Sequence, residues 1–350
     1  MTDTPLKLGF TMPAEWEEHS AIWLAWPYDE ITFPEGRVEK IEKIYVEIIK
    51  NIHTSEDIEL LVLNEQMKTK ATQMIADAGI NLSKITFHIT DYADVWMRDY
   101  GPTFIKNPET RELAWVKWNY NAYNNKFPDL LKDNEVFFAL RKTVDKRMFE
   151  PGILLEGGAL EVNGSGVCLT TEQCLLARNP NFSKEQLENY LRGFLGVKKV
   201  IWLKQGLPHD HTDGHIDELA RFVSSNKIVC AYEENREDEN FKVLDDNYQA
   251  LCKATDTNGN PFEVIKLQVP HITYDSNKPF EAGEPAPASY TNFYIGNEVV
   301  LASVFKDAND AAALEALQMC FPDKKVIGVD CSDVIYGGGG VHCMTQQQPS

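Results

Sequence analysis

The chain has 350 residues, of which 43% are hydrophobic and 11% aromatic, so it can build a large folded core. Its formal net charge of -19 argues against nucleic-acid binding, because phosphate binding needs clustered lysine and arginine and no such stripe is present. An acidic protein can attract cationic molecules, although the simpler interpretation of this charge is solubility. The length fits one large α/β domain or two ordinary domains.

The seven cysteines are scattered without a Cys-x-x-Cys pair, which argues against a disulfide framework or a structural zinc site. Six of them lie in or beside apolar runs and are expected to be small core residues: Cys168, Cys174, Cys230, Cys252, Cys320 and Cys331. Residues 1–10 lack a signal-peptide pattern, and no apolar run approaches the roughly 20 residues of a membrane helix. We therefore expect a cytoplasmic protein that does not bind membranes.

The first elements predicted along the chain alternate between strand and helix. They are a strand at Ala21–Trp26, a helix at Arg37–Asn51, a strand at Ile58–Leu63, a helix at Gln66–Ala78 and a strand at Ile85–Ile89. Four hairpins follow, with turns that contain asparagine or glycine between apolar runs. Their strands are Thr103–Ile105 with Leu113–Trp118, Ala159–Val162 with Val167–Thr170, Leu219–Val223 with Ile228–Ala231, and Asn292–Ile295 with Val299–Val304.

Three of these hairpins are each followed by a predicted helix and a short strand. These are Ser183–Leu195 with Lys199–Leu203, Asp238–Thr255 with Phe262–Gln268, and Asp307–Cys320 with Lys325–Val329. A ββαβ unit thus recurs about five times, and the last unit is expected to need the C-terminal strand. Radial repetition of small sheets limits exposed edges, so we predict a ring of five units. The alternative is two unrelated α/β halves.

Polar residues precede the hairpins at intervals of roughly 55 to 75 residues. These joints contain Asp99, Glu156, His215 with Asp217, Pro287–Tyr290, and Cys343. If the units close into a ring, equivalent joints meet at its centre. The joints would then bring a thiol, an imidazole and three carboxylates together.

The first joint, residues 94–102, combines carboxylates, an arginine and aromatic side chains. Asp99 beside an aromatic wall at Trp96 suits an organic cation. Arg98 with an aspartate could equally be a structural ion pair. Glu156 stands before two glycines, which permit close backbone approach, although an ordinary turn glutamate is the simpler interpretation.

The segment at residues 209–218 is the densest, with three histidines and three aspartates. His215 and Asp217 would lie on one side of an extended strand and could form a catalytic pair. A metal site built from His209, His211 and His215 is a weaker alternative, because no second ligand cluster accompanies it. A polar loop without catalytic function is the third interpretation.

Cys343 follows four glycines, Gly337–Gly340, close to the last residue of the chain. Such a run packs nothing and suits a sharp bend or close approach to a ligand, so we interpret Cys343 as a nucleophile. Nearby carboxylates would raise the thiol pKa and weaken it. That arrangement becomes useful if the substrate is a cation that neutralises them, and a planar guanidinium pairs bidentately with carboxylates.

In its motifs, the chain resembles the agmatine deiminases of the guanidine-modifying pentein superfamily. The matching motifs run in order through nearly the whole chain: residues 12–17, 23–27, 96–102, 155–158, 212–217, 287–295, Gly337–Gly340 and 342–347. The resemblance implies one catalytic domain over residues 1–350, with the pentein fold, a five-bladed α/β propeller of ββαβ repeats with pseudo-fivefold symmetry. His211 and Gly340 stand at positions that vary more within the family, so the resemblance implies the chemistry but not the fine specificity.

The resemblance also implies roles for individual residues. Cys343 would be the nucleophile and His215 the general acid/base, with Asp99 and Asp217 on the guanidinium nitrogens and Glu156 orienting His215 or the substrate. Trp96 would line the pocket, and Asp213 and Gly340 complete the predicted substrate-binding set. The reaction would convert agmatine to N-carbamoylputrescine and ammonia through a thiouronium intermediate on cysteine, as a step of putrescine and polyamine biosynthesis. Neither a metal nor a cofactor is implied.

Alternatives remain open at this level. A peptidylarginine or free-arginine deiminase would use the same chemistry, and Arg98 is the candidate partner for the carboxylate of arginine. A metal-dependent hydrolase and a catalytically silent guanidinium-binding protein are the other classes. The stretch 278–288 could be a mobile rim loop or an ordinary surface loop. The sequence leaves the oligomeric state open, with a homodimer as one option, and it leaves the group that binds the distal amine unassigned among Glu15, Asp29 and Asp213.

Overall fold

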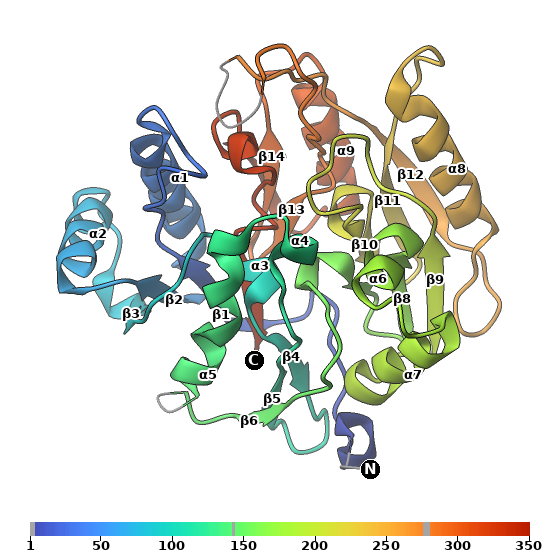
Figure 1. The fold of residues 1–350 in the computed structure, drawn as a ribbon, viewed down its shortest axis with the longest axis horizontal. Helices are drawn as coiled ribbons and strands as arrows, with labels where there is room; N and C mark the ends of the chain where they lie inside the picture. Colours follow the sequence, from blue (N-terminus) through green and yellow to red (C-terminus); the bar gives the residue numbers. More distant parts are fainter. Residues whose placement is uncertain (1–3, 142–143, 276–280) are drawn as a thin grey trace.

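The fold is described from a computed structural model, which covers residues 4–141, 144–275 and 281–350. Its strands form five separate sheets, and helices join them in a mixed α/β arrangement (Figure 1). One sheet has four strands, in the order β16 (Gln346–Pro349), β1 (His19–Ala25), β2 (Asp57–Val62) and β3 (Ile85–Ile89).

The other four sheets have three strands each and contain consecutive stretches of the chain. Their strands are β4 (Thr103–Lys106), β5 (Leu113–Val116) and β6 (Arg147–Phe149); β7 (Glu161–Val162), β8 (Val167–Thr171) and β9 (Lys199–Leu203); β10 (Ala220–Ser224), β11 (Lys227–Tyr232) and β12 (Glu263–Gln268); and β13 (Phe293–Ile295), β14 (Val299–Val304) and β15 (Lys325–Asp330). In each, the first two strands are antiparallel and the third is parallel to the second.

Helices provide the crossovers that parallel strands require. They are α1 (Arg37–Ile52), α2 (Glu65–Asp77), α4 (Ala122–Asn125), α5 (Val136–Leu140), α6 (Glu172–Arg178), α7 (Lys184–Leu195), α8 (Glu239–Lys253) and α9 (Asp310–Cys320), whereas α3 (Met97–Tyr100) is a single turn before β4. Local sequence explains several of their starts. Ser183 and Gln186 form a capping box on α7, and Asn64 accepts a hydrogen bond from Met67 N at α2.

The repeated ββαβ unit predicted from the sequence is confirmed, with one difference. The C-terminal strand β16 does not complete the last unit, because β13, β14 and β15 already form a full sheet. Instead β16 pairs antiparallel with β1, where Trp23 faces Gln346, and completes the N-terminal sheet. The two ends of the chain therefore share one sheet, and Cys343, just before β16, lies at a joint.

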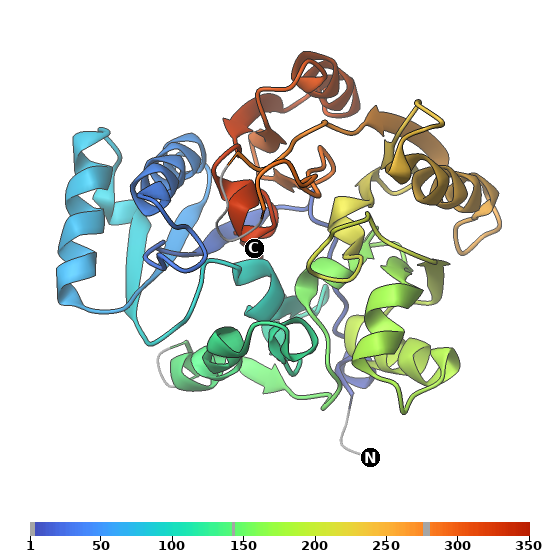
Figure 2. The same cartoon turned by 45° about the horizontal axis from the view of Figure 1, so that its top comes forward.

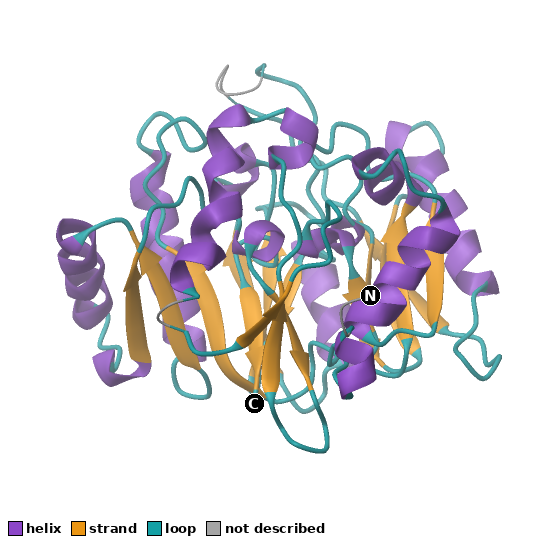
Figure 3. Cartoon of the chain, turned by 60° about the horizontal axis from the view of Figure 1, so that its bottom comes forward, coloured by secondary structure: helices purple, strands orange, loops and turns teal. Residues whose placement is uncertain are grey.

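The sheets follow one another around the middle of the molecule in sequence order (Figure 2). The strands gather in one half of the molecule, and most of the loops and short helices lie in the other half (Figure 3). The first two strands of each three-stranded sheet are largely buried, as β8 and β14 show. The third strands, β6, β9, β12 and β15, are only partly buried at the sheet edges.

Some expectations about individual elements were wrong. Helices α5 and α6 and strand β6 were not predicted, because short segments carry too little periodicity. Cys252, expected in the core, is exposed on α8, and Cys320 is only partly buried. All seven cysteines are free. Part of the predicted rim loop, residues 278–280, lies outside the described residues, and within the described ranges no helix has the length and apolarity to cross a membrane.

Candidate active site

Five joints between the sheets bring their polar residues together, as the ring prediction required. Asp99 lies in α3 before β4, and Glu156 immediately precedes the 3-10 turn Gly157–Ala159 before β7. His215 and Asp217 lie at the 3-10 turn Ile216–Glu218 before β10. Asn292 precedes β13 and Cys343 precedes β16.

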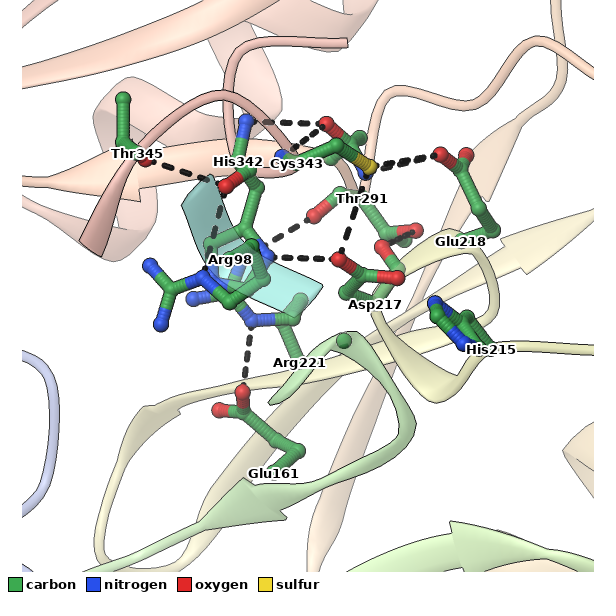
Figure 4. A network of polar contacts seen from close by, with 12 residues as sticks. Arg98, Glu161, His215, Asp217, Glu218, Arg221, Thr291, His342, Cys343 and Thr345 are labelled. Carbon is green, nitrogen blue, oxygen red and sulfur yellow. Dashed lines mark hydrogen bonds and ion pairs between the residues drawn. The ribbon is translucent and has the colours of Figure 1, made fainter. Parts of the chain in front are cut away.

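The surroundings of Gly158 show how close together the side chains of His215, Asp99 and Asp217 lie. A Cβ placed on Gly158 would lie 2.6 Å from His215 Nδ1, 2.8 Å from Asp99 Oδ1 and 3.0 Å from Asp217 Oδ2. Only a residue without a side chain can occupy that point. Asp217 Oδ2 lies in turn 3.7 Å from the sulfur of Cys343 (Figure 4).

His215 lies between two carboxylates and is fully buried. Its Nδ1 is 3.5 Å from Asp99 Oδ1, and its Nε2 is 3.7 Å from Glu156 Oε2. Burial alone would lower the pKa of His215, but the charge of Asp99, with contributions from Cys174 and Glu156, raises it well above its ordinary value. The imidazole is therefore protonated in the free protein and can act as an acid.

Two neighbours fix Asp99 from the sides that His215 leaves open. Gly158 N donates to Asp99 Oδ1 at 3.0 Å, and the hydroxyl of Tyr123 donates to Asp99 Oδ2 at 2.7 Å. Burial raises the pKa of Asp99 to about 6, despite the opposing charge of His215. Tyr123 reaches this position from a run of four non-glycine residues with positive φ, 122–125, a strained conformation that often marks functional sites.

Glu156 is held from behind by Arg178, a buried residue of α6. Arg178 Nε donates to Glu156 Oε1 at 2.8 Å, and its other nitrogens donate to Asp213 Oδ2 and to the carbonyl of Thr212. Burial alone would raise the pKa of Glu156, but contacts with His215 and Arg178 hold it below its ordinary value. Glu156 is thus an ionised carboxylate that orients His215.

Cys343 lies among acidic groups and one amide. Its sulfur is 3.7 Å from both Asp217 Oδ2 and Glu218 Oε1, and Asn292 Nδ2 lies 3.0 Å from it (Figure 4). Burial and the charges of Asp217, Glu218 and Asp99 raise the pKa of the Cys343 thiol well above its ordinary value. The thiol is therefore unreactive until positive charge enters the site.

Asp217 is kept ionised by the residue that precedes the thiol. His342 Nδ1 lies 2.7 Å from Asp217 Oδ2, and His342 Nε2 lies 2.9 Å from Glu15 Oε2. Burial alone would raise the pKa of Asp217, but the hydrogen bond and charge of His342 hold it below its ordinary value. Burial and the charge of Asp217 raise the pKa of Glu218 well above its usual range.

Several buried polar atoms around the thiol lack a hydrogen-bond partner in the described residues. They are Asp217 Oδ1, Glu218 Oε2 and both ring nitrogens of His215. Native structures rarely leave buried polar atoms unpaired, so such a group calls for an explanation. The unpaired acceptors next to a protonated imidazole match a planar ligand that carries several N–H donors.

The position of Trp96 explains why two of the four residues in the run Gly337–Gly340 are glycine. A Cβ on Gly337 would lie 2.5 Å from Trp96 Cζ2, and one on Gly339 would lie 2.8 Å from Trp96 Cζ3 and 3.1 Å from Cys343 Sγ. Gly337 and Gly339 must therefore lack a side chain, because the backbone there packs against the indole. Asp99, Trp96 and Cys343 line a cavity of about 200 Å³.

Not every predicted residue lies in this cavity. Gly340 is buried, and a Cβ there would meet Ser303 Oγ and Asn292 Oδ1, so it packs beneath the loop of Cys343. Asp213 lies behind Glu156, where it binds Arg178 and Lys126. Arg98 is buried among Gln347, Glu15 and the carbonyl of His342, and it does not line the cavity.

The histidines of the metal alternative point in different directions. His209 pairs with Glu239 at 3.2 Å, His211 lines the cavity beside Phe127, and His215 lies between Asp99 and Glu156. Among the described residues, the side-chain groups that could hold a metal ion do not unite these three histidines.

Several residues that support the site were not predicted from the sequence: Tyr123, Arg178, Glu218, Asn292 and His342. Glu218 and His342 adjoin predicted residues, so their positions alone made them candidates. Asn292 stood within a quoted motif without a role. Tyr123 and Arg178 lie in short elements that periodicity does not predict, and their neighbours are far away in the sequence.

Comparisons with known proteins show which family the chain resembles over its whole length. The family described as Porphyromonas-type peptidyl-arginine deiminase matches residues 11–349. A protein of Legionella pneumophila strain Paris named "Putative agmatine deiminase" is 37% identical over 100% of this chain and 98% of its own length. One of Latilactobacillus sakei with the same name is 34% identical over 99% of this chain and 98% of its own.

Solved structures give the same result. An agmatine deiminase of Enterococcus faecalis, described as catalysing its reaction, has a TM-score of 0.92 and 33% identity over 100% of this chain and 98% of its own. A substrate-bound agmatine deiminase of C. jejuni with a Cys-to-Ser substitution has a TM-score of 0.85 and 29% identity over 97% and 96% of the two chains. An amidinotransferase of Microseira wollei, 11% identical with a TM-score of 0.54, shares the fold.

Proposed function

We propose that this chain, which belongs to the Porphyromonas-type peptidyl-arginine deiminase family, is an agmatine deiminase that hydrolyses agmatine to N-carbamoylputrescine and ammonia. One observation carries the proposal. The thiol of Cys343 and the carboxylate of Asp99 line one cavity. The protonated imidazole of His215 and the carboxylate of Asp217, with its unpaired Oδ1, lie directly beside them, and that set complements a guanidinium.

The substrate cation would activate the thiol. Asp99 and the free Oδ1 of Asp217 bind guanidinium nitrogens, and the added positive charge stabilises the thiolate of Cys343 against the surrounding acids. The indole of Trp96, packed along the glycine run, forms the wall against which the planar group lies.

The reaction then proceeds in two halves. The thiolate attacks the guanidinium carbon and forms a C–S bond, His215 protonates one nitrogen, and the C–N bond breaks to release ammonia. This leaves a cationic thiouronium on Cys343 and a neutral His215. His215 next removes a proton from water, and the hydroxide attacks the same carbon. The C–S bond breaks, and the hydroxyl proton passes to the departing thiolate, which leaves the neutral ureido product, the Cys343 thiol and a protonated His215. Glu156 orients His215 throughout.

The fold supports the finer assignment as well. We propose that the five sheets form the blades of a pentein propeller with pseudo-fivefold symmetry, in which the whole chain, residues 1–350, is a single catalytic domain. The recurring pattern of one antiparallel and one parallel pairing supports this assignment, as does the pairing of β16 with β1. Cytoplasmic location, a homodimer and a place in polyamine biosynthesis stay predictions from the sequence.

Arginine is the less favoured substrate. Arg98, the candidate for its carboxylate, already binds Gln347 and Glu15 and does not line the cavity. The test is product analysis with agmatine, arginine and a peptidyl-arginine, without added metal and after treatment with a chelator. We expect N-carbamoylputrescine from agmatine, and a thiouronium adduct at Cys343 by mass spectrometry of quenched reactions. Full activity of a folded Cys343→Ser variant would refute nucleophilic catalysis.

A further inference from the structure

The cavity beside Cys343 contains a second buried carboxylate that the proposed chemistry does not use. Asp94 is 1% exposed and lines the cavity together with Thr32 and Trp96. The indole of Trp96 separates it from the thiol. Trp96 Nε1 donates to Asp94 Oδ2 at 2.9 Å, whereas the opposite edge of the ring, at Cζ3, adjoins Gly339 and Cys343. Asp94 and Cys343 therefore lie at opposite edges of one indole.

The partners of Asp94 leave its negative charge uncompensated. They are the hydroxyl of Thr32 at 2.6 Å, Trp96 Nε1 and the backbone N of Val95, all neutral donors. Thr32 Oγ1 also lies 2.9 Å from Asp29 Oδ2, and a hydroxyl has only one proton to donate. Burial raises the pKa of Asp94 to about 7, and no charged partner within the described ranges counters it.

The rest of the cavity wall fits an aliphatic chain and a cation. Ile31, Phe127 and Leu130 supply apolar surface to the same cavity, and neither lysine nor arginine is among the described residues of the lining. Burial lowers the pKa of His211, the one histidine of the lining, so it adds no positive charge at neutral pH. A ligand carboxylate would find no cationic partner here and would be repelled by Asp94.

We propose, on the basis of the proposed function, that Asp94 binds the distal ammonium of the substrate, whose alkyl chain lies along the indole of Trp96 while its guanidinium faces Cys343. The site then selects ω-guanidinoalkylamines over alkylguanidines that lack the amine, and over arginine, whose carboxylate would face Asp94. A bound ammonium also keeps Asp94 ionised, and it supplies the positively charged partner that Thr32, a neutral donor, cannot.

The test compares kcat/KM for agmatine with kcat/KM for 1-butylguanidine, which keeps the guanidinium and the chain but lacks the amine. In Asp94→Asn we expect the ratio of the two values to fall about ten- to hundredfold, the size of one charged hydrogen bond. Because both substrates contact Trp96, a displaced indole would change both values and leave the ratio. Asp91→Asn, an exposed aspartate paired with Lys132, is the matched control and should retain the wild-type ratio.

Two results would overturn the inference. The first is a wild-type enzyme with equal kcat/KM values for agmatine and 1-butylguanidine, which can be measured without any variant. The second is an Asp94→Asn enzyme whose ratio of these two values equals that of wild type. Failure of the proposed function looks different, because agmatine would then not be deiminated at all. In that case, calorimetric affinities of the Cys343→Ser protein for the same two ligands still decide the subsite. A clear preference for agmatine supports it, and equal affinities refute it.

Discussion

Nδ1 of His342 lies 2.7 Å from Oδ2 of Asp217, immediately beside the nucleophile. The other ring nitrogen lies 2.9 Å from Glu15 Oε2. Ionised carboxylates only accept hydrogen bonds, so each ring nitrogen of His342 faces one carboxylate acceptor. In the same buried cluster, Arg98 and Arg221 both contact Glu15. Arg221 also pairs with Glu161 (Figure 4).

His342→Gln should therefore impair the enzyme through Asp217. A glutamine amide cannot donate to both carboxylates from two separate ring positions, so Asp217 loses its orientation and part of its ionisation. We expect kcat/KM for agmatine to fall at least about tenfold, with the acid limb of its pH profile moved to higher pH as the pKa of Asp217 rises. His209→Gln, at an exposed pair with Glu239, is the control and should keep the wild-type profile. An unchanged acid limb in His342→Gln would contradict this role.

The raised pKa of the Cys343 thiol predicts how its rate of alkylation depends on pH. Because burial and the charges of Asp217, Glu218 and Asp99 raise the pKa of Cys343, the free enzyme holds the neutral thiol at neutral pH. Alkylation by iodoacetamide, followed at Cys343 by peptide mass spectrometry, should be slow at pH 7–8 and still rise above pH 9, because the thiolate forms only there. The exposed Cys252 is an internal reference that should react first.

Removal of one neighbouring charge should speed this reaction. In Asp217→Asn the thiol loses an ionised neighbour, so its pKa falls and alkylation at pH 8 becomes faster. Asp57→Asn, which removes an exposed carboxylate paired with Lys84, should leave the rate unchanged. Fast alkylation of wild-type Cys343 at pH 7 would show that the acidic surroundings do not silence the thiol.

Sequence patterns predicted the fold well because the strands are continuous apolar runs between turn residues. Strands such as Lys199–Leu203 and Val299–Val304 were predicted with their observed bounds. The pairing of β16 with β1 could not be predicted in this way, since it joins residues more than 300 positions apart and neither strand has a local signal for its partner. Helix α6 was not predicted for another reason, because its 7 residues are too few to show a helical period.

The site could be predicted as far as its chemistry depends on residue type. A thiol, a histidine and carboxylates at equivalent joints were visible in the sequence, and the joints do meet. Whether a carboxylate faces the cavity or a buried arginine depends on packing across sheets. Asp213 is one example, because Arg178 holds it behind Glu156. Asp94 is another, because its proximity to the cavity follows from the position of Trp96.

Arg178 should matter for stability as well as for catalysis. Its guanidinium is completely buried and binds Glu156, Asp213 and the carbonyl of Thr212. Arg178→Met removes the nearer cation and leaves Glu156 buried with only His215, at 3.7 Å, as a cationic partner. Removal of one partner of a buried ion pair typically costs about 3–5 kcal/mol in the free energy of unfolding. Urea unfolding measures this. Arg192→Met, on the exposed face of α7, should change stability by less than about 0.5 kcal/mol. Equal effects of the two substitutions would contradict the buried role.

Gly158 offers the sharpest steric test of the site. An added Cβ would lie 2.6 Å from His215 Nδ1 and 2.8 Å from Asp99 Oδ1, so Gly158→Ala must push the imidazole and the carboxylate apart. Displacements of about 1 Å in a catalytic site cost about a hundredfold in rate, and we expect at least that loss in kcat. Gly193→Ala is the matched control, because its Cβ would meet only Thr4 at 3.4 Å within helix α7. Since alanine favours helix over glycine, Gly193→Ala should keep full activity and raise the free energy of unfolding by about 0.5–1 kcal/mol. A Gly158→Ala enzyme with wild-type kcat would mean that His215 and Asp99 need not converge on that point during the reaction.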